Sequence, residues 1–474
     1  MNRKHILELF AAFKQRDIRA VVWKNFAEID DALDAKSDLD LLIPESDWRN
    51  ARLVLLERGF VRAENFVVEF PNVYHYFGLV DGEILHLNIY TRLVTGESQT
   101  KLYDLPLVDR LIDSAGYHFH NSVLTSSPSV SLHLFLLRYF IKISSLSSLL
   151  RYAIDRSDYK SEAERILKHD VNSLVDESPV TGGLSNKELL WVFQNQSFSR
   201  QLLFGLLVKI RLIGFSRCSP LRGFAFRYWQ VAKRIANKMF FKRKKRLKKG
   251  GAIIALTGLD GAGKSTSVNS LRGFFATHFD CESLHLGRPE PVLLSLPVRA
   301  ALKVRGMMIK QRPMPSTQGR SDKESSAIAA IRYVILAMER FHVMQRALRA
   351  RSVGKIVVLD RYPSQSFNKM DGPRIVSLKR SKFVRVMSQI ERWFYTSMPT
   401  ADLLMVLEVP VEVALQRNRD RIKKDKESDD EIIQRHAHNR DLEYLAMKVQ
   451  SVDMNRSPQE TMGDIRALAW RALN

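Results

Sequence analysis

The sequence predicts a multidomain α/β protein in which an N-terminal α/β domain and a helical middle segment precede a C-terminal domain with a parallel sheet. Helix and strand signals alternate at first, and helical periodicity then takes over. Further on, an apolar run is followed by a glycine-rich turn and a helical pattern, the order of elements in a phosphate-binding loop. The predicted parts are residues 1–125, residues 126–241, a polybasic linker at 242–250, and residues 251–474.

The charge of the chain is unusual for a globular protein. Its 474 residues carry a formal net charge of +23, which points to anionic partners such as nucleotides, nucleic acid or an acidic membrane surface. A solvated basic surface without a single partner is the alternative. Cys218 and Cys281 supply neither a disulfide framework nor zinc-ligand spacing. The N-terminus has the pattern of an amphipathic helix rather than a signal peptide, and no apolar stretch is long enough to span a bilayer. We expect a cytoplasmic protein that can lie at the inner face of the membrane.

Two carboxylates stand out in the N-terminal domain. Asp38 and Asp40 occupy positions i and i+2 of a predicted strand, so their side chains point to the same side. Such a pair can hold a divalent metal against a nucleoside triphosphate. The alternative is that the two residues cap a strand end at the surface. The elements predicted here are helices at Asn2–Gln15 and Ser46–Arg58 and strands at Ile18–Trp23, Asp38–Ile43 and Glu83–Tyr90.

Residues 18–90 resemble the nucleotidyltransferase superfold, in particular its aminoglycoside-type branch. That family has a small glycine-containing turn, a D-x-D strand and a third carboxylate on a later strand. Asp38 and Asp40 match the D-x-D, whereas the turn contains Lys24 and the later strand, ILHLNIY, has no carboxylate. The resemblance implies either nucleotidyl transfer by this domain or, as the interpretation we favour, a related domain kept for binding or scaffolding.

The middle segment contains helical patterns and no catalytic motif. His133 lies in an apolar stretch and is interpreted as a core histidine. The segment resembles the helical appendages of some nucleotidyltransferase domains and is expected to pack on the N-terminal domain. The predicted helices are Val130–Tyr152, Ser161–Lys168, Lys187–Ile213 and Arg222–Phe241.

The stretch Arg222–Lys249 combines aromatic side chains with basic ones and ends in a polybasic run. This combination suits an anionic membrane surface or a nucleic-acid backbone. An ordinary packed helix followed by a solvated basic linker is the alternative.

The most specific motif is GLDGAGKST, which follows the predicted strand Ala252–Leu256. Its glycines let backbone N–H groups turn towards phosphate oxygens, and the N-terminus of the next helix adds positive potential. Lys264 is expected to contact the β- and γ-phosphates of ATP, and Ser265 to ligate Mg²⁺. The predicted ATP-binding residues are Gly258, Asp260, Gly261, Ala262, Gly263, Lys264, Ser265 and Thr266.

A second acidic position follows the predicted strand Ile356–Leu359, which ends in Asp360-Arg361-Tyr362. An acid at the carboxyl end of a parallel strand emerges beside the phosphate loop, so Asp360 can serve the metal together with Ser265. The other elements predicted in this domain are a strand at Ser283–Leu286, a long helix at Glu324–Arg349, a strand at Ala401–Val409 and a helix at Val411–Ile422 that runs into an arginine-rich segment.

Together these motifs resemble the thymidylate kinase family of nucleoside monophosphate kinases over residues 251–474. The resemblance implies ATP- and Mg²⁺-dependent phosphoryl transfer to a nucleoside monophosphate of the dTMP type or a related phosphate-bearing acceptor. It gives catalytic roles to Lys264, Asp360, Arg361, Arg417 and Arg421, the last two from a basic lid. It gives acceptor contacts to Arg288, Arg340, Arg361 and Tyr362.

The acceptor side departs from dedicated thymidylate kinases. Asp360-Arg361-Tyr362-Pro363 is followed further along the chain by Asp371-Gly372-Pro373-Arg374, a combination similar to kinase-like proteins encoded with surface-polysaccharide genes. Gly261 stands where some family members have an arginine, so the catalytic arginine is expected from the lid. One alternative is therefore an ATP-binding regulatory or surface-polysaccharide-associated protein without monophosphate kinase activity. Another is nucleotidyl transfer by the N-terminal domain.

Overall fold

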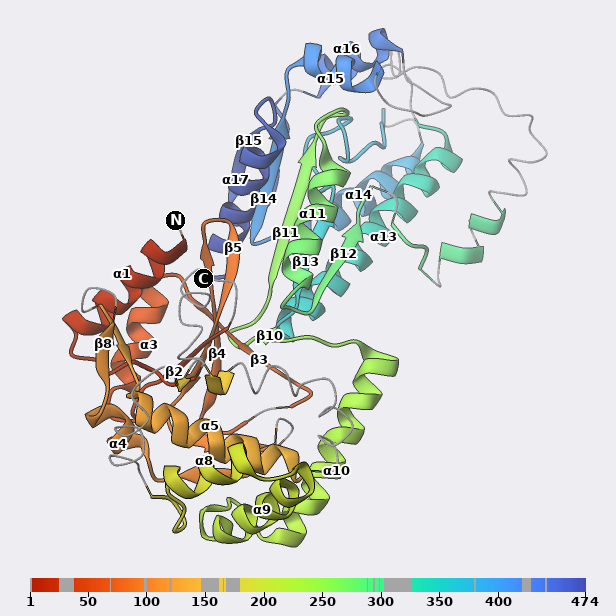
Figure 1. Cartoon of the computed structure of the whole chain (residues 1–474). Helices are drawn as coiled ribbons and strands as arrows, with labels where there is room; N and C mark the ends of the chain where they lie inside the picture. The colour runs from red at the N-terminus through yellow and green to blue at the C-terminus, as the bar shows by residue number, and fades with distance from the viewer. Residues whose placement is uncertain are drawn as a thin grey trace. The chain divides into compact units, whose positions relative to one another are not determined.

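The computed structural model contains two compact units, one of residues 1–245 with Asn474 and one of residues 246–473 (Figure 1). The predicted N-terminal domain and helical segment therefore share unit 1, and the division falls within the predicted polybasic linker. The residues that the structure describes are 2–24, 38–68, 70–97, 100–118, 122–145, 162–164, 166–167, 180–287, 289–292, 295–297, 299–301, 325–378, 381–419, 428–439 and 441–474.

Unit 1 is built around a mixed sheet whose strands lie in the order β3-β4-β5-β2-β1-β9-β8. The strands are β1 (Val21–Val22), β2 (Leu39–Leu42), β3 (Val61–Glu64), β4 (Val73–Val80), β5 (Glu83–Tyr90), β8 (Gly116–His118) and β9 (Val123–Thr125), and β6 (Leu93–Thr95) pairs separately with β7 (Tyr103–Leu105). Strands β2 and β5 run parallel with Asp40 opposite Asn88. This register places the D-x-D strand beside the strand on which a third carboxylate was sought.

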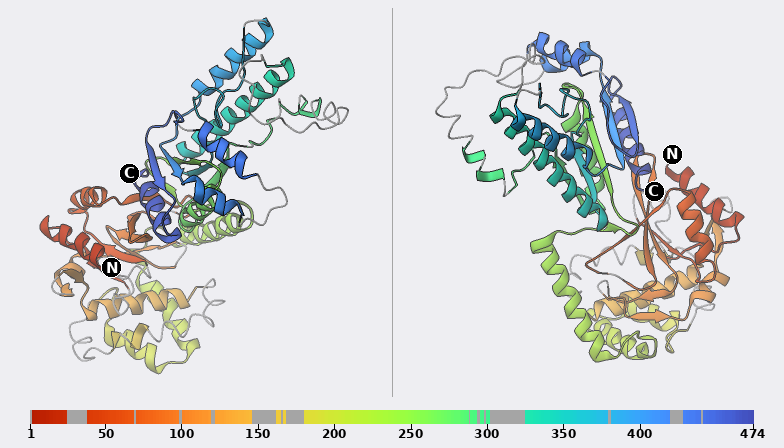
Figure 2. Two further views of the ribbon diagram at one scale, coloured as in Figure 1. Left: turned by 90° about the horizontal axis from the view of Figure 1, so that it is seen from above. Right: turned by 180° about the vertical axis from the view of Figure 1, so that it is seen from behind.

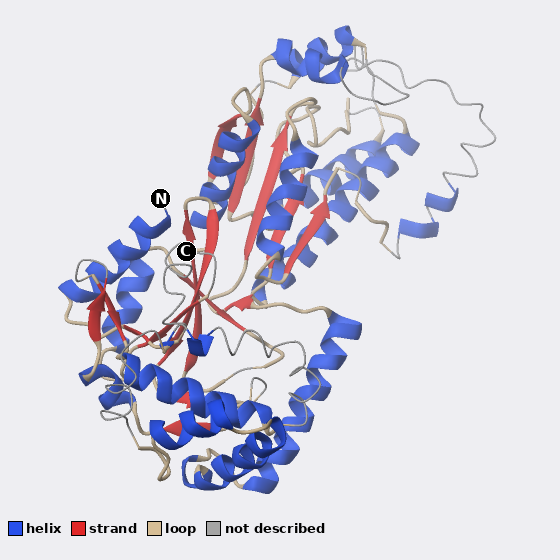
Figure 3. Cartoon of the chain, viewed as in Figure 1, coloured by secondary structure: helices blue, strands red, loops and turns tan. Residues whose placement is uncertain are grey.

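Two hydrophobic cores hold helices against this sheet. One contains residues of α1 (Asn2–Gln15) and α3 (Trp48–Glu57), and the other contains residues of the helices that follow β9. Those later elements, helix-rich in Figure 3, are α5 (Pro128–Ile143), α8 (Asn186–Asn195), α9 (Phe198–Arg211), η2 (Ile213–Phe215), α10 (Pro220–Ala236) and η3 (Asn237–Phe241), with α4 (Val108–Asp113) before β8. The shared core confirms that the helical segment packs on the N-terminal domain.

The single helix predicted over 187–213 is two helices. Gln196 and Ser197 have extended backbone angles between α8 and α9, so the helical hydrogen-bond pattern is interrupted there. Sequence periodicity alone could not find this break because apolar spacing continues across it. Among the described residues, no helix is both long enough and apolar enough to cross a lipid bilayer.

His133 is a satisfied core residue, as predicted. Its side chain is 0% exposed, with Nδ1 2.9 Å from the Asn186 amide oxygen and Nε2 3.0 Å from the Thr181 hydroxyl. Burial lowers its pKa to about 4, outweighing the hydrogen bond from the imidazole to Asn186. The imidazole is therefore neutral in the folded protein at neutral pH.

This shift predicts an acid-side loss of stability. Between pH 6.5 and about 4 the unfolded His133 binds a proton that the folded residue does not bind, so the free energy of unfolding falls as the pH falls. The expected contribution is roughly 3 kcal/mol. Urea unfolding at several pH values in this range gives the free energy of unfolding as a function of pH. Its slope against pH should be shallower for His133→Gln than for the wild type, while the exposed-site control His342→Gln keeps the wild-type slope. Equal slopes for all three proteins would contradict the prediction.

Unit 2 is a doubly wound α/β unit. Its five parallel strands lie in the order β12-β13-β11-β14-β15, with α13 and α14 on one face and α11 and α17 on the other (Figure 2). The unit begins with the short strand β10 (Arg246–Leu247). Its sheet contains β11 (Ala252–Gly258), β12 (Cys281–His285), β13 (Ile356–Asp360), β14 (Leu403–Glu408) and β15 (Val449–Asp453). Its helices are α11 (Lys264–Ala276), α13 (Ala327–Ser352), α14 (Lys382–Thr396), α15 (Val411–Arg419), α16 (Asp429–His438) and α17 (Pro458–Arg471).

The strand order decides where a ligand can bind. Strand β11 lies in the middle of the sheet, with β13 and β12 on one side and β14 and β15 on the other. The strand order reverses direction at β11, so a crevice is expected at its carboxyl end. The phosphate-loop motif lies at that end. Asp360 ends the neighbouring strand β13, where Leu256 and Asp360 are register partners. The parallel-sheet prediction is therefore confirmed.

Candidate functional site

The loop between β11 and α11 has the backbone of a phosphate cradle. Gly261 and Gly263 have φ values of +86° and +77°, which favour glycine. A Cβ atom on Gly261 would lie 2.9 Å from the Cα of Ala414 in α15, so a side chain at this position would collide with that helix. This contact explains why the loop has no arginine there. Helix α11 starts directly after Gly263 and leaves Ser265 and Thr266 exposed in its first turn.

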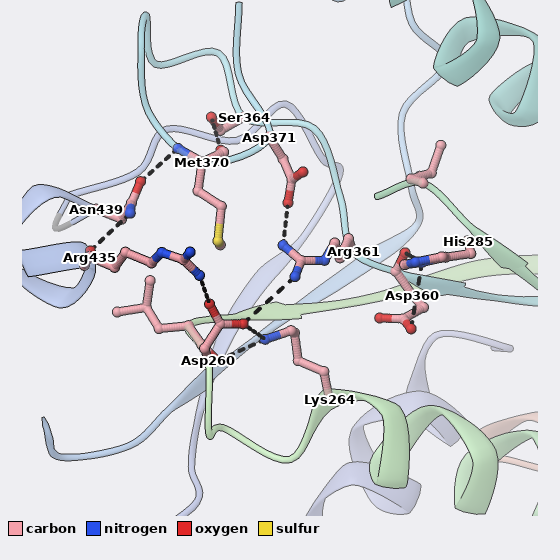
Figure 4. Close-up of polar contacts among 12 residues, drawn as sticks. Asp260, Lys264, His285, Asp360, Arg361, Ser364, Met370, Asp371, Arg435 and Asn439 are labelled. Carbon is pink, nitrogen blue, oxygen red and sulfur yellow. Dashed lines mark hydrogen bonds and ion pairs between the residues drawn. The ribbon is translucent and has the colours of Figure 1, made fainter. Parts of the chain in front are cut away.

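Three cations converge on the Asp260 carboxylate at the mouth of this loop (Figure 4). Arg435 donates to Asp260 at 2.9 Å, and the Lys264 and Arg361 nitrogens each lie 3.7 Å from it. Lys264 also donates to the carbonyl oxygen of Leu259 at 2.8 Å. These contacts gather positive charge from the loop, from the end of β13 and from α16 at one point.

The electrostatics of this cluster are coupled. Burial lowers the pKa of Lys264, and Asp260 opposes that shift. Burial acts to raise the pKa of Asp260, but the charge of Lys264 and the hydrogen bond from Arg435 outweigh it and leave this pKa below its ordinary value. Asp260 is therefore ionised at neutral pH and acts as an internal counter-ion for the three cations.

Asp360 lies beside Lys264 in Figure 4, and its charge acts on that lysine. The Nδ1 of His285 lies 3.6 Å from an Asp360 carboxylate oxygen and 3.1 Å from its carbonyl oxygen. The described residues contain no group of three His, Cys, Asp or Glu side chains placed to hold a metal. One carboxylate and one hydroxyl, from Asp360 and Ser265, do fit Mg²⁺, because this ion takes most of its other ligands from phosphates and water.

Arg361 has a left-handed backbone, with φ of +71°, and its N–H donates to the Leu256 carbonyl at 2.9 Å. Such a conformation costs about 1 kcal/mol or more in a non-glycine residue, and it turns the side chain from the strand end towards the loop. Gly287 provides the space, because a Cβ atom there would lie 2.4 Å from the Cδ of Arg361. The guanidinium bridges Asp260 and Asp371, with its contact to Asp371 at 3.3 Å.

Arg340 is fully engaged within the protein. It is 3% exposed and donates to the carbonyl oxygen of Leu286 at 2.9 Å and to the Tyr395 hydroxyl at 2.7 Å. It also donates to the Asp371 carbonyl at 2.8 Å and to the Asp371 carboxylate at 2.6 Å. In this structure Arg340 therefore fixes the loop that carries Asp371, and the predicted contact with an acceptor stays a prediction.

Other predicted residues have different outcomes. Arg417 donates to the Gly261 carbonyl at 3.1 Å and to the Met454 carbonyl at 2.8 Å, so it braces the phosphate loop rather than extending over it. Tyr362 is buried, and its hydroxyl accepts from the Ala401 N–H at 3.1 Å and donates to the Leu445 carbonyl at 2.6 Å. This side chain is used by the fold in this structure. Arg288 and Arg421 lie outside the described residues.

Arg435 is the site residue that the sequence analysis missed. Its helix α16 begins with a capping box, in which Ser428 and Glu431 satisfy each other's backbone N–H groups. The same helix is held near residues 366–371, where Asn439 accepts from the Met370 N–H at 2.6 Å. The Ser428-x-x-Glu431 pattern in the sequence indicates the N-terminus of a helix. It could have suggested a helix containing Arg435, but not its contact with Asp260.

If the site transfers a phosphoryl group, as the sequence resemblance implies, Arg435→Ala is expected to lower kcat/KM about 100-fold, because it removes one cation from a site where charge must be neutralised. The side chain is 47% exposed, so the thermal midpoint should change by no more than a few degrees. The matched control is Arg346→Ala, which removes an arginine of similar exposure that pairs with Glu290. Unchanged transfer by the Arg435 variant would remove this residue from the site.

The D-x-D carboxylates of unit 1 are bound by protein groups. Asp40 accepts from Lys24 at 3.2 Å, and Asp38 lies 3.0 Å from the Nδ1 of His86. Asn88, opposite Asp40 on β5, donates to Asp38 at 3.5 Å. Burial lowers the pKa of Lys24 to about 8, and Asp40 partly opposes the shift. A lysine ammonium thus occupies one side of the proposed metal site, and nucleotidyl transfer by this unit stays a prediction that none of these contacts favours.

Comparison with known proteins is consistent with a nucleotide site. No protein-family model matches the chain. The chain is similar to two curated proteins of Escherichia coli, from strain K12 and from the O6:H1 strain CFT073, each named "Uncharacterized ATP-binding protein YghR". Each is 27% identical over 177 residues, which cover 35% of this chain and 69% of the relative. These names attribute ATP binding to the two relatives and give them no reaction.

Proposed function

We propose that unit 2 binds ATP with Mg²⁺ and transfers the γ-phosphoryl group to a nucleoside monophosphate, of the dTMP type or a related phosphate-bearing acceptor. The observation that carries the proposal is the convergence of Lys264, Arg361 and Arg435 at the mouth of a glycine-rich phosphate loop. Phosphoryl transfer needs positioning and charge neutralisation more than covalent help from the protein, and this arrangement supplies both. The name of the relatives supports the proposal that this chain binds ATP.

Each residue has a role in this proposal. The backbone N–H groups of the loop and the start of α11 hold the phosphates, and Lys264 neutralises the charge between the β- and γ-groups. Ser265 and Asp360 would hold Mg²⁺, which when bound supplies further positive charge to the phosphate oxygens. Arg361 and Arg435 orient and neutralise the transferred and accepting groups from the opposite side. Arg340 positions the loop through Asp371.

The decisive experiment uses the full chain, Mg²⁺ and ATP labelled in the γ-position, with a panel of nucleoside and sugar monophosphates as acceptors. Label in a diphosphate product supports the proposal and names the acceptor class. Tight ATP binding with no labelled product from any acceptor would reject phosphoryl transfer. The absence of ATP binding would reject the site itself.

The second candidate is an ATP-binding regulatory or surface-polysaccharide-associated protein that transfers no phosphoryl group. The burial of Arg340 favours it, because this guanidinium is 3% exposed and donates to four protein acceptors, which leaves few donors for an acceptor phosphate. Calorimetric titration with ATP and with a non-hydrolysable analogue separates the two candidates. Equal affinity, with no product in the labelled assay, supports regulation by binding.

A further inference from the structure

Helix α10 and the short π-helix η3 direct their large apolar side chains outward. The exposed fractions are 56% for Phe224, 60% for Trp229, 65% for Met239 and 73% for Phe240. Surface helices of globular proteins normally turn their apolar stripe towards the core. The exposed apolar side chains of this segment are Leu221, Phe224, Phe226, Tyr228, Trp229, Ile235, Met239, Phe240 and Phe241, which we call the α10 surface.

The opposite side of α10 is small or polar and is fixed against unit 1. Gly223 is buried beside Leu102, and Gln230 is 5% exposed. Arg227 forms an ion pair at 2.6 Å with Glu97, which is itself 3% exposed. Because these residues hold the inner side of the helix, the apolar side cannot turn inward without exposing a buried carboxylate. The outward orientation is therefore a property of the folded unit.

The chain segment that carries the α10 surface has charged residues of a single sign. The chain has no Asp or Glu between Glu188 and Asp260, whereas it has sixteen Lys and Arg residues there. Basic side chains alternate with the apolar ones, and the Lys233 ammonium lies 5.5 Å from the centre of the Trp229 ring. Aromatic and basic residues together on one helix face are typical of helices that lie in the interface of an anionic bilayer.

We propose that the α10 surface binds an anionic phospholipid membrane, with α10 lying in the plane of the headgroups. A nucleic acid fits less well, because Leu221, Ile235 and Met239 are aliphatic side chains on which bases do not stack and which a polyanionic strand would leave in water. The acyl region of a bilayer covers such side chains, while the lysines contact the headgroups. The α10 surface belongs to unit 1, whereas the candidate nucleotide site belongs to unit 2.

Vesicle flotation of the full chain tests the proposal, with vesicles of phosphatidylcholine alone and vesicles that also contain phosphatidylglycerol. Trp229→Ser and Phe240→Ser should each lower the partition coefficient about tenfold. Trp191→Ser is the matched control, because this tryptophan lies in α8 of the same unit and is 57% exposed. Lys264→Ala should bind vesicles as the wild type does.

A second pair of variants tests the role of charge, each with a set of four exposed lysines changed to Gln. Neutralising the first set should lower binding to anionic vesicles by roughly 100-fold or more, and added salt should weaken the wild type in the same direction. The first set is Lys233, Lys238, Lys242 and Lys244, and the control set is Lys4, Lys14, Lys187 and Lys382. Thermal unfolding confirms that every variant is folded.

Selective loss in the α10 variants, with both controls unchanged, supports the proposal. Three outcomes overturn it: no binding to either vesicle, equal binding to neutral and anionic vesicles, or equal losses in the control variants. Binding to single-stranded RNA that the same α10 variants abolish, without vesicle binding, would assign the surface to nucleic acid instead.

Discussion

Lys264→Ala is expected to lower ATP turnover by at least about 100-fold while leaving the fold intact. The lysine joins the phosphate loop to the other cations of the site, since its ammonium contacts both the Leu259 carbonyl and the Asp260 carboxylate. In the proposed complex the same ammonium would neutralise charge that develops on the transferred group. Its loss therefore raises the transition-state barrier by about 2.7 kcal/mol or more.

Steady-state kinetics with labelled ATP, together with a thermal melt, measure this effect. Lys355→Ala is a suitable control. Lys355 belongs to the same unit but not to the loop, and its ammonium lies 3.4 Å from the Glu282 carboxylate. Turnover of the Lys264 variant within threefold of the wild type would exclude this loop as the reaction site. A large fall in the thermal midpoint would instead indicate that the lysine is needed for folding.

Arg340→Met is expected to destabilise unit 2 by about 3 kcal/mol or more, the lower end of the usual cost of breaking a buried ion pair by removing one partner, since Arg361 stays 3.3 Å from Asp371. The variant would leave the Leu286 carbonyl and the Asp371 carboxylate without their buried donor. The free energy of unfolding of Arg340→Lys should lie between those of the wild type and Arg340→Met, because a single ammonium cannot replace a planar guanidinium that reaches four acceptors. Urea unfolding gives the free energies.

Arg346→Met, an exposed position on the same helix, should change the free energy of unfolding by less than about 0.5 kcal/mol. The result also separates two roles for Arg340. If Arg340→Met kept its stability but lost transfer to the acceptor, the residue would be a substrate contact, as the resemblance to thymidylate kinases implies. Loss of stability assigns it to the architecture of the Asp371 loop.

Local patterns predicted the parts of the site that neighbouring residues determine. The strand, loop and first helical turn around Lys264 follow from glycine placement and apolar spacing, and they are found at residues 252–276. Asp360 could be expected beside them because parallel strands end at one edge of a sheet. Strand β5 was predicted with the bounds that the structure has.

The contacts that depend on packing could not be predicted. Arg435 is far from Asp260 in the sequence, and only the docking of α16 beside the loop joins them. The direction of Arg340, inward to Asp371, depends on a loop whose course no local pattern indicates. In unit 1, Lys24 reaches Asp40 through the pairing of β1 with β2, a contact that the D-x-D motif does not reveal.

The position of Asp260 has a consequence for how an empty and a filled site would compare. Without this carboxylate, three cations would repel one another whenever no substrate is present, and the loop would open. In the proposed complex, an incoming polyphosphate would have to displace the Asp260 carboxylate from Lys264, Arg361 and Arg435. Binding would then replace one negative group by another. Its free energy would depend on how much more strongly the three cations attract the polyphosphate than they attract Asp260.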